Sequence, residues 1–145
     1  RPLAPDGTPV DEWLVPIAEV EEYVAGLFEA YDCRGVGFDP AFITWSADTL
    51  TGRGLTMVEW PQTDSRMVPA TQALYELAVN EELAHDGDPV LADHVRSVVA
   101  KQTRQGGQRL GKGQQNRQID LAIALTMAVG MMVGDERMPV VQAFL

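Results

Sequence analysis

Two aspartates stand where a carboxylate could hold a metal ion. Asp39 closes the short stretch "GVGFDP" at 35–40, and Asp120 precedes the apolar run "LAIALTMAVGMMV" at 121–133. Carboxylate oxygens suit Mg²⁺ and Mn²⁺, which proteins usually hold with few carboxylates plus water and phosphate. One carboxylate just after a strand and another at the start of a core-facing helix therefore predict a hard-cation site.

Each aspartate also has an ordinary structural interpretation. An acid near a helix start is stabilised by about 0.3–1 kcal/mol through the free N–H groups and the dipole, so Asp120 would be a cap. Asp39-Pro40 after a strand is a common turn. Two-metal cleavage of a phosphodiester places ions about 3.5–4 Å apart, so its carboxylates must converge. The 80 residues between the two aspartates leave that convergence to the fold.

A basic segment lies between Arg96 and Arg117, and no acidic residue interrupts it. It holds six of the eleven basic residues: Arg96, Lys101, Arg104, Arg109, Lys112 and Arg117. The Gly106-Gly107 pair in its middle predicts a hairpin or a mobile loop with a basic surface. Such a surface either faces solvent or contacts the phosphates of a nucleic acid.

The remaining candidate residues favour structural roles. We interpret His85 and His94 as capping or surface residues, and Cys33 as a core residue at a helix end. The methionines of the last helix are interpreted as packing residues: Met127, Met131 and Met132. The sequence shows no phosphate-binding glycine loop, no zinc-type Cys/His spacing and no Ser-His-Asp signature.

Composition indicates one globular domain. The chain has 145 residues, of which 46 % are hydrophobic and 22 % charged. The net charge of −10 does not point to nucleic acid, although binding depends on where the charge lies. A single cysteine favours a reducing, cytoplasmic setting. The apolar run 121–133 is too short to span a membrane, so we expect no membrane partner.

The apolar pattern predicts an α/β order of elements. A helix over 17–31 is followed by a strand at 36–38, which Pro40 ends. Next come a helix over 41–50, a strand over 55–60 and a helix over 69–84. The helix over 69–84 is expected to bury Ala73, Leu74, Leu77 and Ala78. Asp88 is expected to cap a helix that starts at Pro89 and turns Leu91, Val95 and Val98 inward. A final helix starts near Asn116.

Three blocks of sequence resemble a known family when taken in order. They are "GVGFDPAFI", "MVEWPQTDSRMVPATQALYELAVNEELAHDGDPVLADHV" and "RLGKGQQNRQIDLAIALTMA". Together they resemble the C-terminal nuclease domain of the large terminase subunit of tailed phages and prophages, over about residues 17–130. Residues 1–16 are then a linker, 17–134 the C-terminal part of the nuclease domain, and 135–145 a tail. The chain opens with Arg1 in a linker-like stretch, so we expect a fragment of a longer protein.

The resemblance implies a fold and a reaction. The fold is a partial ribonuclease H-like mixed sheet flanked by helices, with its first strands missing. The family cuts concatemeric double-stranded DNA at two Mg²⁺ or Mn²⁺ ions, and its metal ligands fall on Asp39 and Asp120. The DNA-contacting residues expected in the basic segment are Lys101, Arg104, Arg109, Lys112 and Arg117. The implied partners are DNA, an ATPase domain, a small subunit and a portal, in the cytoplasm of a bacterial host.

The chain departs from the family pattern in ways that keep alternatives open. Gln118 stands where the family has a lysine, Leu121 replaces a glycine, and the family's first catalytic aspartate lies on a strand that the chain lacks. An open sheet edge would favour self-association or a partner strand. The alternatives are a non-catalytic remnant or interaction module of the packaging machinery, and a related ribonuclease H-like resolvase.

Overall fold

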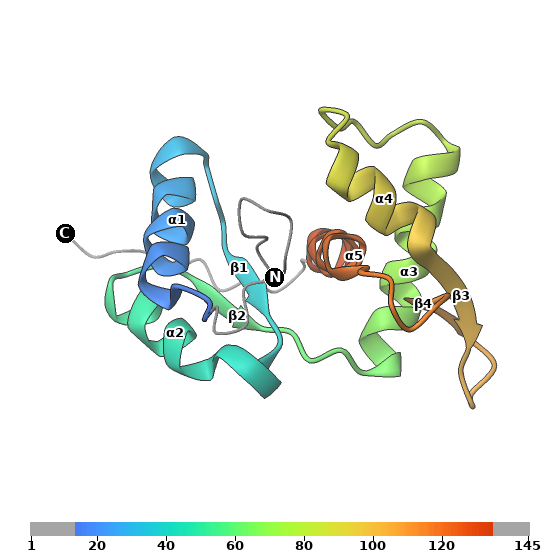
Figure 1. Ribbon diagram of the computed structural model, residues 1–145, viewed down its shortest axis with the longest axis horizontal. Helices are drawn as coiled ribbons and strands as arrows, with labels where there is room; N and C mark the ends of the chain where they lie inside the picture. The colour runs from blue at the N-terminus through green and yellow to red at the C-terminus, as the bar shows by residue number, and fades with distance from the viewer. Residues whose placement is uncertain (1–13, 135–145) are drawn as a thin grey trace, which may run out of the picture. The chain divides into compact units, whose positions relative to one another are not determined.

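The computed structural model describes residues 14–134, so most of the expected linker and all of the expected tail lie outside the described residues. The described helices are α1 (Ile17–Ala30), α2 (Pro40–Gly52), α3 (Asp64–Val79), α4 (Pro89–Ser97) and α5 (Asp120–Val133). The strands are β1 (Val36–Phe38), β2 (Met57–Glu59), β3 (Val98–Gln102) and β4 (Gln108–Lys112) (Figure 1). They form two two-stranded sheets, β1-β2 and β3-β4.

The chain divides into two compact units. The first unit takes in the chain up to Gly35 together with Ile43–Met57, and the second unit takes in Val36–Phe42 and everything from Val58 onward. Helix α2 passes from one unit to the other at Ile43, where its backbone leaves the helical region with φ −130° and ψ 25°. Both aspartates singled out above therefore belong to the second unit.

The first unit is built from α1 and the later turns of α2. Ala25 of α1 is buried, and so are Ala47 and Leu50 of α2. The expected helix over 17–31 is confirmed, but four of its apolar residues are exposed, namely Ile17, Val20, Tyr23 and Tyr31. The spacing therefore indicated the helix correctly, whereas only part of its apolar face is covered.

Polar contacts fasten the two helices of the first unit. Arg53 donates two hydrogen bonds to the Glu22 carboxylate, at 2.8 and 3.1 Å. This pairing lowers the pKa of Glu22 and raises the pKa of Arg53. The half-buried Cys33 thiol approaches the Leu27 carbonyl at 3.5 Å, which agrees with its interpretation as a helix-end residue.

The core of the second unit lies between α3 and α5. Trp60, Met67, Ala70 and Met127 form a buried cluster. A Cβ placed on Gly130 would lie 2.7 Å from both the Ala70 Cβ and the Trp60 ring, so glycine is what lets the two helices approach. Figure 1 shows α3 and α4 next to α5, consistent with the contacts that both make with it.

Helix α3 begins earlier than the sequence suggested. It starts at Asp64 rather than Pro69, so Pro69 lies inside the helix and cannot donate a backbone hydrogen bond there. Met67, which is 0 % exposed, belongs to this extra turn, and its burial offsets part of that cost. The expected buried face was wrong: Ala73, Leu74 and Leu77 are only half-buried and Ala78 is exposed, whereas the earlier residues Met67 and Ala70 are buried. The helix also ends at Val79 rather than at the expected residue 84.

The basic segment folds as the predicted hairpin. Strands β3 and β4 pair antiparallel, with Lys101 opposite Arg109. The Thr103 N–H donates to the Gly107 carbonyl at 2.7 Å, and Gly106 takes the positive φ of 89° that the turn requires. The hairpin is not a free loop, because β4 packs along α3 and Gly107 sits against the Val68 side chain.

Candidate functional site

Asp39 lies directly after β1 and starts the turn into α2. Its Oδ1 accepts a hydrogen bond from the Ala41 N–H at 3.1 Å, and the residue is half-buried. This contact is the local turn that an Asp-Pro sequence favours. The Asp39 Oδ1 thus stabilises the turn between β1 and α2. The same hydrogen bond fixes the carboxylate at the end of the strand.

Asp120 is the first residue of α5 and is exposed. The expected start near Asn116 was wrong, since Ile119 has φ −138° and ψ 10° and the residues before it are outside the helix. Ile119 makes no side-chain cap, but its side chain is buried. The N–H of Leu121 donates instead to Nδ1 of His94 at 3.1 Å. Another side chain therefore caps this N–H, so the described contacts do not give Asp120 that role.

The second unit holds both aspartates on elements that touch. Strand β1 meets α5 where Gly37 faces the sulfur of Met131, so that a side chain at 37 would require the flexible Met131 side chain to move. Met131 lies eleven residues after Asp120, or about 16 Å along the helix axis. Within residues 14–134 no group of three or more His, Cys, Asp or Glu side chains could hold a metal ion. A metal site shared by the Asp39 and Asp120 carboxylates therefore stays a prediction.

From the sequence, His94 was interpreted as a capping or surface residue, with Val95 turned inward. The capping interpretation is confirmed by the bond from the Leu121 N–H, whereas the surface position and the inward Val95 are wrong. The structure has His94 buried at 7 % exposure and Val95 exposed at 47 %. The available signal was its spacing, since His94 follows Leu91 by three residues and shares its face of α4. Asp88 caps α4 as predicted, through a 2.7 Å bond from the Leu91 N–H.

His85 fits its interpretation as a local turn residue. Its Nδ1 accepts the Gly87 N–H at 3.0 Å, and the residue is exposed. Of the three methionines expected to pack, Met127 is buried, Met131 is half-buried and Met132 is 60 % exposed. The packing interpretation holds for the two methionines that face the rest of the second unit.

The basic residues of the hairpin divide into two kinds. Arg109 is only 26 % exposed, and its Nη1 donates to the Gln62 carbonyl at 3.0 Å and to the Asp64 carboxylate at 2.8 Å. It ties β4 to the start of α3. Lys101, on β3, is exposed, and so are the three other expected DNA contacts: Arg104, Lys112 and Arg117.

Two of these exposed side chains, Lys101 and Arg104, border a shallow polar hollow that Asp64 also lines. The hollow has a volume of about 590 Å³ and is lined by both strands and their turn, including Lys101 and Arg104. The stem of Lys101 lies over Gly111 of the opposite strand. Arg117 approaches Asp93 at 3.9 Å, and since both side chains are more than half exposed this pair contributes little stability. The hairpin is therefore a rigid support with basic groups on its surface.

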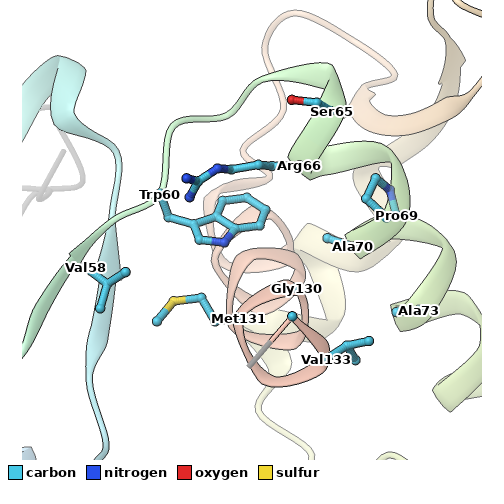
Figure 2. A pocket seen from close by; sticks show the side chains of 11 residues that line it. Val58, Trp60, Ser65, Arg66, Pro69, Ala70, Ala73, Gly130, Met131 and Val133 are labelled. Carbon is cyan, nitrogen blue, oxygen red and sulfur yellow. The ribbon is translucent and has the colours of Figure 1, made fainter. Parts of the chain in front are cut away.

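An apolar pocket of about 440 Å³ lies between the end of β2, α3 and the last turn of α5 (Figure 2). The Arg66 guanidinium lies 5.7 Å from the centre of the Trp60 ring, and its Nη1 donates to the Glu59 carbonyl. Val58, Met131 and other apolar groups complete the wall. None of the described residues that line it carries a carboxylate, an imidazole or a thiol; its polar side chains are Ser65 and Arg66.

No described helix combines the length and the apolar character that crossing a bilayer requires.

Comparison with known proteins gives consistent matches. The family model described as terminase large subunit, endonuclease domain, matches residues 8–136. The large terminase subunit of Enterobacteria phage HK97 is 28 % identical over 135 residues, which cover 89 % of this chain and 25 % of that protein.

Two crystal structures are similar in fold. The HK97 large terminase superposes with a TM-score of 0.70 at 28 % identity, covering 80 % of this chain and 25 % of that one. The large terminase nuclease of the thermophilic phage G20c gives a TM-score of 0.64 at 17 % identity, covering 82 % of this chain and 63 % of that one. These likenesses confirm the expected ribonuclease H-like α/β class.

Proposed function

The chain belongs to the endonuclease-domain family of phage terminase large subunits, and from this premise we propose that it carries the metal-dependent, DNA-cutting site of a packaging terminase. The family match over residues 8–136 is the observation that carries the proposal. The chain spans about a quarter of the length of the HK97 relative, at 25 %. Because the chain covers only this part of a terminase, its substrate, concatemeric double-stranded DNA, and its partners in a whole terminase are also proposals.

The residues present fit Mg²⁺ or Mn²⁺ better than a softer metal. Asp120 is exposed at the start of α5, where a hydrated cation can reach it, and Asp39 is held at the end of β1. Both offer oxygen ligands, which hard cations prefer. The bond that His94 accepts at Nδ1 leaves that atom unable to bind a metal at the same time. Two carboxylates suffice for one hydrated ion, and a second ion needs further negative ligands.

The proposed chemistry assigns the chain's own residues to positioning. Asp39 and Asp120 would hold the cations, which when bound would supply activation of water and stabilisation of the leaving 3′-oxygen. Because Ile119 is buried and the Leu121 N–H is bonded, the Asp120 backbone is held from both sides. A carboxylate on an ordered helix start presents the same geometry to each incoming phosphate.

The hairpin is the proposed surface for the DNA backbone. Lys101, Arg104, Lys112 and Arg117 are exposed on or beside β3 and β4, which are fixed to α3 by Arg109. Contacts to phosphate fix the position of a duplex and carry no sequence information. Binding by this surface is therefore sensitive to salt and largely indifferent to sequence.

The proposed partners follow from the family and from the open strands. An ATPase domain, a small subunit and a portal are expected to assemble with the chain in the bacterial cytoplasm. Within the described residues β1 and β2 pair with each other alone, so each is an edge strand. Edge strands accept further strands, which supports pairing with another segment or with a second copy of the chain.

A plasmid-nicking assay tests the proposal. The 145-residue chain is incubated with supercoiled plasmid and Mn²⁺, with EDTA as the metal-free control, and compared with Asp120→Asn and with Asp48→Asn. Asp48 is exposed on α2 in the first unit and serves as the matched control. We expect nicking by the wild type and by Asp48→Asn, and loss of nicking in EDTA and in Asp120→Asn. Nicking by Asp120→Asn at the wild-type rate would remove Asp120 from the site.

A second candidate function is a non-catalytic interaction module of the packaging machinery. The observation that favours it is the lack of any three-acid group among residues 14–134. It predicts that the chain binds Mn²⁺ weakly and never nicks plasmid under any metal condition. A resolvase is less favoured, since the family match extends over almost the whole chain.

A further inference from the structure

Helix α5 receives its N-terminal cap from a different helix. The first N–H groups of a helix have no partner within it, and a Ser, Thr, Asp or Asn at the N-cap usually accepts one. The N-cap of α5 is Ile119, which has no polar side chain and makes no cap. His94, 27 residues earlier on α4, accepts the Leu121 N–H through Nδ1 at 3.1 Å.

The burial and the tautomer of His94 both suit it to accept the Leu121 N–H. It is 7 % exposed, and it is one of the few polar side chains in the buried interior of the described residues. Because Nδ1 accepts the bond, the ring proton of the neutral imidazole resides on Nε2. The imidazole therefore satisfies one of the first N–H groups of α5 that Ile119 leaves open.

The cap holds the residue on which the proposed metal site depends. Asp120 lies between Ile119, whose side chain is buried, and Leu121, whose N–H is bonded to His94. We propose that His94 is the positioning residue that fixes the Asp120 carboxylate for metal binding. This inference rests on the proposed function, because it gives the cap a purpose only if Asp120 binds the cation.

A second contact supports the same arrangement. Asp93, the neighbour of His94, lies 3.9 Å from the Arg117 guanidinium in the loop before α5. The pair is exposed and loose, so it guides the loop without fixing it. Adjacent residues of α4 thus contact both the approach to α5 and its first turn. Of these two contacts, the hydrogen bond to the buried His94 imidazole is the directional one.

Two isosteric substitutions separate positioning from simple packing. Asparagine at 94 places its Oδ1 close to where Nδ1 of the imidazole lies, so His94→Asn keeps an acceptor for the Leu121 N–H. Glutamine places its amide where Nε2 lies, so His94→Gln keeps the polarity and the bulk but removes that acceptor. If His94 only fills space, the larger Gln variant should be the milder change.

Nitrogen-15 NMR of the 145-residue chain measures both the protection of the Leu121 amide and the binding of Mn²⁺ near Asp120. In His94→Gln we expect the Leu121 amide to exchange with solvent about tenfold faster, while His94→Asn stays close to wild type. Titration with Mn²⁺ broadens amides near a bound ion. We expect His94→Gln to need about tenfold more Mn²⁺ than wild type for the same broadening at residues 119–122, and His94→Asn to match wild type.

The outcomes distinguish this inference from the proposed function. Asp120→Asn, titrated in parallel, should lose the broadening; if it does not, the proposed function fails whatever His94 does. If Asp120→Asn loses it while His94→Gln binds Mn²⁺ as wild type does, the positioning role alone is refuted. If His94→Gln does not fold, His94→Asn decides: wild-type broadening supports the acceptor role and weakened broadening overturns it.

Discussion

Salt dependence of DNA binding gives the sharpest test of how the hairpin works. Four basic side chains on the hairpin or in the loop after it are exposed, namely Lys101, Arg104, Lys112 and Arg117, whereas Arg109 is held by Asp64 and the Gln62 carbonyl. Each phosphate contact with duplex DNA contributes a slope of about −0.9 to the logarithm of affinity against the logarithm of salt. Four contacts give a slope of about −3.6, so affinity falls about 150-fold between roughly 50 and 200 mM salt.

The assay is fluorescence anisotropy of a labelled duplex in EDTA, so that no cutting occurs. Lys101→Gln and Arg104→Gln should each reduce the size of the slope by about 0.9. The double variant Asp64→Asn, Arg109→Gln removes both charges of this partly buried pair and should leave the slope near its wild-type value. Arg34→Gln, an exposed change in the first unit, is the control for net charge.

Two results would refute this reasoning. A slope that falls as much in the double variant as in Lys101→Gln would mean that Arg109 leaves Asp64 to contact phosphate. A slope that is unchanged in Lys101→Gln and Arg104→Gln would mean that the duplex lies on another surface. Circular dichroism of each variant shows whether the hairpin and helices remain folded.

Three further predictions concern stability. Gly130→Ala should lower the free energy of unfolding by about 1–3 kcal/mol in urea titrations because it overpacks the core, while Gly26→Ala, which meets no atom within 4 Å, should raise it by about 0.5–1 kcal/mol. Asp88→Ala should cost about 1 kcal/mol through loss of its helix cap, and Asp88→Asn should restore most of it; equal losses would contradict the cap. Because Arg53 lowers the pKa of Glu22, their pair stabilises the folded chain above the unfolded pKa and loses that effect as pH falls through the folded pKa. The stability difference between wild type and Glu22→Gln should therefore be small at neutral pH and shrink further in acid, as urea midpoints across pH would show.

Periodicity and capping chemistry were enough to locate most elements. The helix over 17–30, the strand at 36–38 and the hairpin of the basic segment lie where the pattern put them. Asp88-Pro89 marked the start of α4 correctly, because a side-chain oxygen before a proline satisfies the first N–H groups of a helix. These signals succeed because they depend on neighbours within one or two turns of chain.

Boundaries and burial failed where distant contacts decide them. Pro69 was expected to start α3, but the burial of Met67 against Trp60 and Met127 extends the helix by a turn. Arg109 was grouped with the DNA-contacting residues, and only the packing of β4 on α3 brings Asp64 to its guanidinium. Neither contact can be predicted from the residue pattern of the neighbouring sequence.

The sequence by itself determined the family, the element order and the two carboxylates proposed as metal ligands, because these are properties of residue type and spacing along the chain. Only the tertiary structure decided that His94 faces inward and caps α5, and that Arg109 is a structural tie. The physical reason is that a hydrogen bond across 27 residues depends on how two helices pack. Helix packing is settled by the whole core, of which any local stretch of sequence holds only a part.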